Sequence, residues 1–131
     1  MRTFVTTLTA AILVATSAAA SPNAGLEAMT KQKLNEAHAS ALIPVVACES
    51  GFRQYRENGN LLRNPTVKDV VGIMQLREKF HPDPAVLSEY NSEHGTNYRR
   101  NDFDLEDPEE NVDYGIILYK VEGLDPWDCA G

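Results

Sequence analysis

The stretch Pro44-Val45-Val46-Ala47-Cys48-Glu49-Ser50-Gly51 decides how this sequence is interpreted. It is apolar as far as Cys48 and then turns polar. Proline is accepted in the first turn of a helix, and glycine commonly follows the last helical residue. The stretch therefore predicts a short apolar helix that ends near Glu49, with Gly51 as its C-terminal cap.

Glu49 is the candidate for chemistry because it ends an apolar helix instead of lying on a polar face. Desolvation disfavours the charged form of a carboxyl group, so a partly buried glutamate keeps a proton that it can donate as a general acid. The alternative is a glutamate at a helix end that points into water and has no chemical role.

A helix precedes this stretch and a less regular segment follows it. Residues at helical spacing predict an amphipathic helix over Leu26–Ala41. Residues 52–71 lack such a pattern, and Asn58-Gly59-Asn60 is a strong signal for a turn or hairpin. A short apolar run, Gly72-Ile73-Met74-Gln75-Leu76, comes next.

Two further helices are expected in the C-terminal half. Pro82-Asp83-Pro84 opens one that extends to about Glu93, and a loop follows from Gly95 to Asp104. Asp107-Pro108-Glu109-Glu110 has the features of a helix start, and this helix should extend to Glu122 and stop at Gly123. Its expected inner stripe consists of Val112, Ile116, Ile117 and either Tyr119 or Val121. Helices dominate and strands are short, which predicts an α+β fold that is mainly α-helical, with a short hairpin or irregular β region.

The N-terminal residues have the layout of a secretory signal peptide. Arg2 gives a positive start, an apolar run broken only by threonines extends from Phe4 to Ala15, and Ala18-Ala19-Ala20 supplies small residues for a signal peptidase. We expect cleavage after Ala20, a flexible leader over residues 21–25 and one domain over residues 26–131. The protein should then be secreted or periplasmic, without a stable membrane anchor, because the run is too short to span a bilayer. The alternative is a buried N-terminal helix.

The sequence has two cysteines, Cys48 and Cys129. Export to an oxidising compartment favours a disulfide bond between them, which would enclose most of the domain. Two free buried thiols are the alternative. A metal site is disfavoured because His38, His81 and His94 show no ligand spacing near either cysteine.

The formal net charge is −7 at pH 7. This argues against a nucleic-acid partner, which requires a basic surface, and gives no attraction to an anionic membrane. We take the acidity as a contribution to solubility.

Two motifs resemble the soluble lytic transglycosylase family of the lysozyme-like superfamily. The family has a Glu-Ser motif at a helix end and a Gly-Leu-Met-Gln-like motif further on, and the matching segments are Ala47–Gln54 and Gly72–Leu76. A later family helix carries Asn and Tyr, as residues 110–119 do, and the ending Gly123–Cys129 resembles a compact exported branch. The resemblance covers roughly residues 40–129. It implies a compact lysozyme-like domain that cleaves the MurNAc-GlcNAc β-1,4 bond of peptidoglycan glycan strands.

The resemblance also implies roles for individual residues. Glu49 corresponds to the acid that protonates the glycosidic oxygen and then acts as a base. The substrate-binding or orienting positions that it implies are Ser50, Gly72, Ile73, Met74, Gln75 and Tyr114. Ser50 would orient the Glu49 carboxyl group or a substrate carbonyl, and Gln75 would form a hydrogen bond with the substrate or the catalytic loop. Gly72, Ile73 and Met74 would form the floor of the sugar groove, where Gly72 lets the backbone approach the glycan. The Tyr114 hydroxyl would be directed at Glu49. Simpler interpretations are a capping hydroxyl for Ser50, an exposed amide for Gln75, and core packing for Met74 and Tyr114.

One departure from the family bears on activity. Larger transglycosylases carry an Ala-Tyr-Asn segment after the last helix, and this chain has none. Tyr114, Tyr119 or Trp127 would have to replace its contribution. For Trp127 we expect a packing role beside the proposed disulfide.

The reaction implied by the resemblance uses one carboxylate and gives a 1,6-anhydro product, with no metal or cofactor. A hydrolytic muramidase needs a second carboxylate, for which Asp69 and Glu57 are candidates without a supporting motif. A third hypothesis is a non-catalytic lysozyme-like module that binds glycan or a partner in the secretion or cell-envelope machinery. We expect a monomer.

Overall fold

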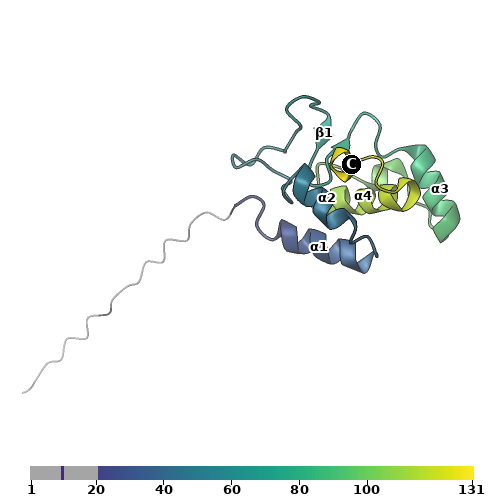
Figure 1. Ribbon diagram of the computed structural model, residues 1–131, viewed down its shortest axis with the longest axis horizontal. Coiled ribbons are helices and arrows are strands. Elements are labelled where there is room, and N and C mark those ends of the chain that lie inside the picture. Colours follow the sequence, from purple (N-terminus) through teal and green to yellow (C-terminus); the bar gives the residue numbers. More distant parts are fainter. Residues whose placement is uncertain (1–9, 11–20) are drawn as a thin grey trace, which may run out of the picture.

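The computed structural model describes Ala10 and residues 21–131 (Figure 1). The signal peptide expected over residues 1–20 therefore lies outside the described residues, apart from Ala10. No helix in the described part of the chain combines the length and the apolar character needed to cross a membrane.

Helix α4 (Pro108–Glu122) is the central element and has the predicted bounds. The Asp107 carboxylate caps it by accepting a hydrogen bond from the Glu110 backbone N–H at 3.0 Å. The helix packs against α1 (Leu26–Glu36) and α3 (Pro84–His94). Its fully or nearly fully buried residues are Asn111, Val112, Tyr114, Gly115, Ile117 and Leu118.

The predicted inner stripe of α4 is wrong in part. Val112 and Ile117 are buried, but Ile116, Tyr119 and Val121 are only half-buried. A single stripe was expected for a helix covered on one side. Instead α4 is covered by α1, by α3 and by Met74, which packs onto Gly115.

The first helix is shorter than expected. It ends at Glu36 rather than Ala41, because His38 has a positive φ of 55° and the Ala39 N–H returns to the Leu34 carbonyl at 2.7 Å. This turn buries Leu34 and Ala39 together. The chain then starts α2 (Leu42–Glu49), with Pro44 in its first turn.

The end of α2 agrees with the prediction. Gly51 has a φ of 62°, and its N–H bonds to the carbonyls of Val46 and Ala47, so it closes the helix that carries Glu49. The segment Ser21–Gly25 is not a free leader, however. The Asn23 side chain accepts hydrogen bonds from the Gln54 and Tyr55 N–H groups and donates one to the Tyr55 carbonyl.

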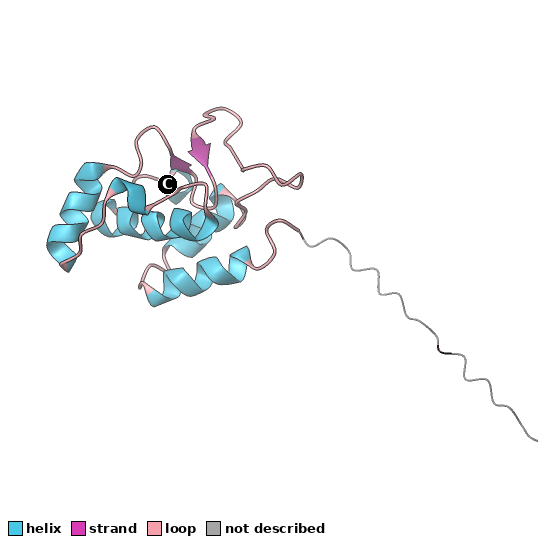
Figure 2. Ribbon diagram, turned by 180° about the vertical axis from the view of Figure 1, so that it is seen from behind, coloured by secondary structure: helices cyan, strands magenta, loops and turns pink. Residues whose placement is uncertain are grey.

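The β region is small. Strand β1 (Val70–Val71) pairs antiparallel with β2 (Leu76–Arg77), and isolated bridges join Tyr55 to Leu61 and Arg63 to Val71. The two strands and α1 lie on opposite sides of the layer that contains α2 and α4 (Figure 1 and Figure 2). The predicted α+β class, mainly helical with a short hairpin, is confirmed for the described residues.

Candidate functional site

A cavity of about 290 Å³ contains the Glu49 side chain. Four parts of the chain form it: the end of α2, the loop before β1, the segment from β1 to His81, and α4 with the C-terminal segment. The lining residues are Glu49, Asn64, Val67, Val70, Gln75, Leu76, Arg77, His81, Leu118, Pro126, Trp127 and Asp128.

The chain end holds the Glu49 carboxyl group. The predicted disulfide between Cys48 and Cys129 is present, with a Cα–Cα distance of 6.0 Å. It places the Cys129 backbone N–H 3.0 Å from Glu49 Oε1, to which it donates a hydrogen bond. The other carboxyl oxygen accepts no hydrogen bond from the described residues. Glu49 is half-buried and lines the cavity, and the protein positions its carboxyl group through Oε1.

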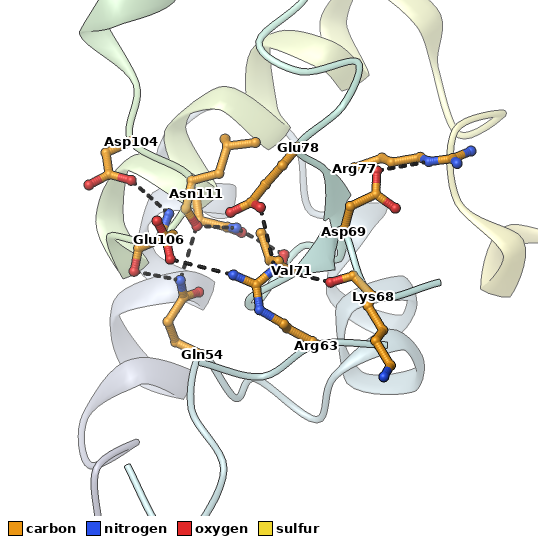
Figure 3. A network of polar contacts seen from close by, with 11 residues as sticks. Gln54, Arg63, Lys68, Asp69, Val71, Arg77, Glu78, Asp104, Glu106 and Asn111 are labelled. Atoms are coloured by element: carbon orange, nitrogen blue, oxygen red, sulfur yellow. Dashed lines mark hydrogen bonds and ion pairs between the residues drawn. The ribbon is translucent and has the colours of Figure 1, made fainter. Parts of the chain in front are cut away.

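The turn between β1 and β2 forms one wall and is held by buried side chains. Gln54 and Asn111, both fully buried, accept hydrogen bonds from the N–H groups of Ile73 and Met74, each at 2.8 Å. Their amide groups in turn donate to the carbonyls of Val71, Leu105 and Glu106 (Figure 3). Two amides from distant segments therefore fix the backbone of this turn.

The carbonyl groups of the same turn are also bound by side chains. Ser50 Oγ donates to the Ile73 carbonyl at 2.6 Å, and Trp127 Nε1 donates to the Met74 carbonyl at 2.7 Å. Gln75 Nε2 donates to the Gly72 carbonyl at 2.9 Å. Ser50 thus joins α2 to the turn, and the expectation that it orients the Glu49 carboxyl group directly is wrong.

Gly72 is required for a different reason from the one expected. Its φ is 76°, and a Cβ atom there would lie 2.4 Å from Gln54 Oε1 and 2.5 Å from Asn111 Nδ2. The close approach is therefore to the buried amides, and not to a glycan. Ile73 and Met74 are likewise fully buried, so neither can contact a substrate. Of the turn residues, only Gln75 lines the cavity.

Tyr114 does not point at Glu49. Its buried hydroxyl oxygen accepts a hydrogen bond from the Asp83 N–H at 2.9 Å and lies 2.7 Å from His81 Nδ1. Burial raises the pKa of Tyr114 to about 12, so the hydroxyl keeps its proton. Burial also lowers the pKa of His81, against the charge of Asp83, which favours the neutral ring. The tautomer of His81 decides which group donates the hydrogen bond between Tyr114 and Nδ1, and the ring lines the Glu49 cavity.

Asp69, the proposed second carboxylate, is engaged elsewhere. It forms an ion pair with Arg77 at 3.1 Å and is absent from the cavity lining. Desolvation opposes the charged form, but the hydrogen bond and the charge of Arg77 outweigh it and lower the pKa of Asp69. Asp128 is the carboxylate that shares the cavity with Glu49, and it is exposed.

The sequence interpretation assigned no role to His81, Asn64 or Asp128, which share the cavity, or to Gln54 and Asn111, which fix its wall. Gln54 lies in the first motif segment, Ala47–Gln54, and Asn111 lies in residues 110–119, so both belong to stretches that resemble the family. His81, Asn64 and Asp128 show no pattern in the sequence.

A larger hollow of about 600 Å³ lies between α1, α3 and α4 and contains none of the predicted site residues. The residues that the structure describes include no group of three or more His, Cys, Asp or Glu side chains that could hold a metal ion. Comparisons with family models, with curated proteins and with solved structures find no match for this chain.

Proposed function

We propose that this protein is an exported glycosidase of the lytic-transglycosylase type, which cleaves the MurNAc-GlcNAc β-1,4 bond of peptidoglycan. The observation that carries the proposal is the position of Glu49. A half-buried carboxyl group, held on one oxygen by the Cys129 N–H, lies in a cavity with hydrogen-bonding groups on several sides. The disulfide suits an oxidising compartment outside the cytoplasm.

The proposed reaction uses Glu49 twice. Its protonated oxygen, the one not bound to Cys129, donates a proton to the glycosidic oxygen as the C1–O bond breaks. The C6 hydroxyl of the muramic acid then attacks C1, and the Glu49 carboxylate takes the proton that this hydroxyl loses. The products are a free 4-hydroxyl group and a 1,6-anhydro sugar, and no water is consumed.

The position of Asp69 supports a mechanism with one carboxylate over a hydrolase that uses Asp69 as the second. Asp69 is paired with Arg77 and does not line the cavity. His81 does line the cavity, and its ring can form a hydrogen bond with a sugar oxygen or an N-acetyl group.

The test is the Glu49→Gln variant on purified peptidoglycan, with mass detection of products. We expect the rate to fall by at least about 10²-fold, because general acid–base catalysis contributes roughly 10²–10⁴-fold. The thermal unfolding curve should stay close to that of the parent, since the amide oxygen can still accept the Cys129 hydrogen bond. Asp69→Asn is the matched control and should remain active.

Product mass separates the enzyme classes. An anhydro product is one water lighter than a hydrolysis product, so hydrated sugars alone would identify a muramidase. A Glu49→Gln variant with more than a tenth of the parent rate would exclude Glu49 as the acid. Absence of turnover by the parent protein, together with glycan binding, would identify a non-catalytic module.

A further inference from the structure

A basic hollow lies next to the Glu49 cavity. It has a volume of about 550 Å³ and is lined by Arg56, Asn60, Leu61, Arg63, Asn64, Pro65 and Lys68. This lining has three cationic side chains and no carboxylate, although the chain as a whole has a net charge of −7. The proposed glycosidase function does not use it.

The three cations differ in their availability. Arg63 is held by Glu78 at 3.3 Å and by Glu106 at 3.6 Å, and it donates a hydrogen bond to the Lys68 carbonyl (Figure 3). Arg56 and Lys68 are exposed, and neither forms an ion pair with any residue in 21–131. Arg63 therefore forms a fixed part of the wall of the basic hollow, while Arg56 and Lys68 are available to bind an anion.

One loop separates the basic hollow from the Glu49 cavity. The Arg63–Val71 bridge and the hydrogen bond from the Asn64 N–H to the Val70 carbonyl close this loop, and the Asn64 side chain accepts from the N–H groups of Thr66 and Val67. Asn64 lines both hollows. Val67 and Val70 line the Glu49 cavity, whereas Pro65 and Lys68 line the basic hollow. The two hollows therefore adjoin at Asn64, on opposite sides of this loop.

We propose that the basic hollow binds carboxylates of the peptide attached to the muramic acid lactyl group, so that the protein selects peptide-bearing glycan over bare glycan. This inference rests on the proposed function. The chemistry matches because the peptide carries several carboxylates close to the scissile sugar, whereas a chitin-like chain carries none. Arginine and lysine side chains are the groups that recognise such anions.

The test compares the double variant Arg56→Gln/Lys68→Gln with the control Arg99→Gln/Lys120→Gln. Both remove two positive charges, but Arg99 and Lys120 line neither hollow. Three probes are used: peptide-bearing glycan strands, the same strands stripped of peptide by an amidase, and a neutral chitooligosaccharide. Binding is measured by calorimetry in the Glu49→Gln background, so that no turnover is needed.

The parent should bind the peptide-bearing strands more tightly than the stripped strands, and salt should reduce this difference. The Arg56→Gln/Lys68→Gln variant should lose about three- to tenfold in affinity for peptide-bearing strands, as expected for exposed charge pairs. Its preference over stripped strands should fall by the same factor. The control variant should keep the parental preference.

Three results would overturn the inference. Equal losses in the two double variants would indicate a general charge effect. An equal loss on stripped strands, which retain the lactyl carboxylate, would place that carboxylate in the hollow in place of the peptide. A loss that also appears on the neutral oligosaccharide would show that the hollow does not bind an anion. Because binding is measured without turnover, failure of the proposed catalytic function would appear separately, in the activity assays of the parent and of Glu49→Gln.

Discussion

Gly59 and Gly72 occupy two tight turns with similar backbone conformations and different causes. Their φ angles are 86° and 76°. The Gly59 turn is closed by its own chain: the Arg56 N–H bonds to the Asn60 carbonyl at 2.7 Å, and the Gly59 N–H bonds to the Arg56 carbonyl at 2.9 Å. A Cβ atom on Gly59 would meet nothing within 4 Å.

The Gly72 turn depends on distant residues. Gln54, Asn111, Ser50 and Trp127 bind the N–H and carbonyl groups of Ile73 and Met74. The same positive φ therefore has two different causes. At Gly59 it belongs to a local turn, and at Gly72 it belongs to a junction of four chain segments. If this junction holds the wall of the Glu49 cavity, substitutions within it should cost more stability than substitutions in the Gly59 turn.

The largest effect is expected from alanine at the two glycines. Gly72→Ala combines backbone strain with overlap against Gln54 and Asn111 and should destabilise the fold by about 3 kcal/mol. Gly59→Ala introduces backbone strain without any overlap, so it should lower the free energy of unfolding by only about 1 kcal/mol. Denaturant unfolding measures both. Similar losses at the two positions would contradict the proposed difference.

Removal of the disulfide should have an effect of similar size. Cys48→Ser/Cys129→Ser, or reduction of the parent, should lower the free energy of unfolding by about 2–4 kcal/mol, because the bridge closes a long loop in the unfolded chain. Activity should fall as well, since the Cys129 N–H binds Glu49 and Trp127 lies two residues away. A midpoint of unfolding that is unchanged by reductant would refute the predicted loss of stability.

Trp127→Phe tests one side chain of the junction. Trp127 is 4% exposed, and its loss leaves the Met74 carbonyl without its donor, so stability should fall by about 1–3 kcal/mol. Trp127 also lines the cavity. If it served chiefly as a platform for sugar stacking, the melting temperature would stay constant and the Michaelis constant would rise.

The smallest effect concerns His81 and pH. Its pKa is lowered in the folded protein from an ordinary value of 6.5, so below about that pH the unfolded chain binds more protons than the folded one. The stability that this residue contributes is present above pH 6.5 and is lost as the pH falls through the lower folded value. In His81→Asn the fall in melting temperature between pH 7 and pH 5 should be smaller. An identical pH profile in the two proteins would show that His81 is not held neutral by burial.

Local signals in the sequence were sufficient for several elements. The capping Asp107 and Gly123 define α4, Gly51 ends α2, and Asn58-Gly59-Asn60 marks an exposed turn, because each of these depends on hydrogen bonds within a few residues. The disulfide was also predictable, since the chain has only one pair of cysteines.

Only the tertiary structure decided how the cavity is built. The burial of α4 on several sides and the contacts of Gly72 and Tyr114 depend on segments far apart in the sequence. The sequence alone predicted Glu49 as the candidate acid and singled out the motif segments Ala47–Gln54 and Gly72–Leu76. Which motif residues face the cavity and which bind the buried backbone follows from packing, because a buried polar group takes whichever partner the fold brings within hydrogen-bond distance.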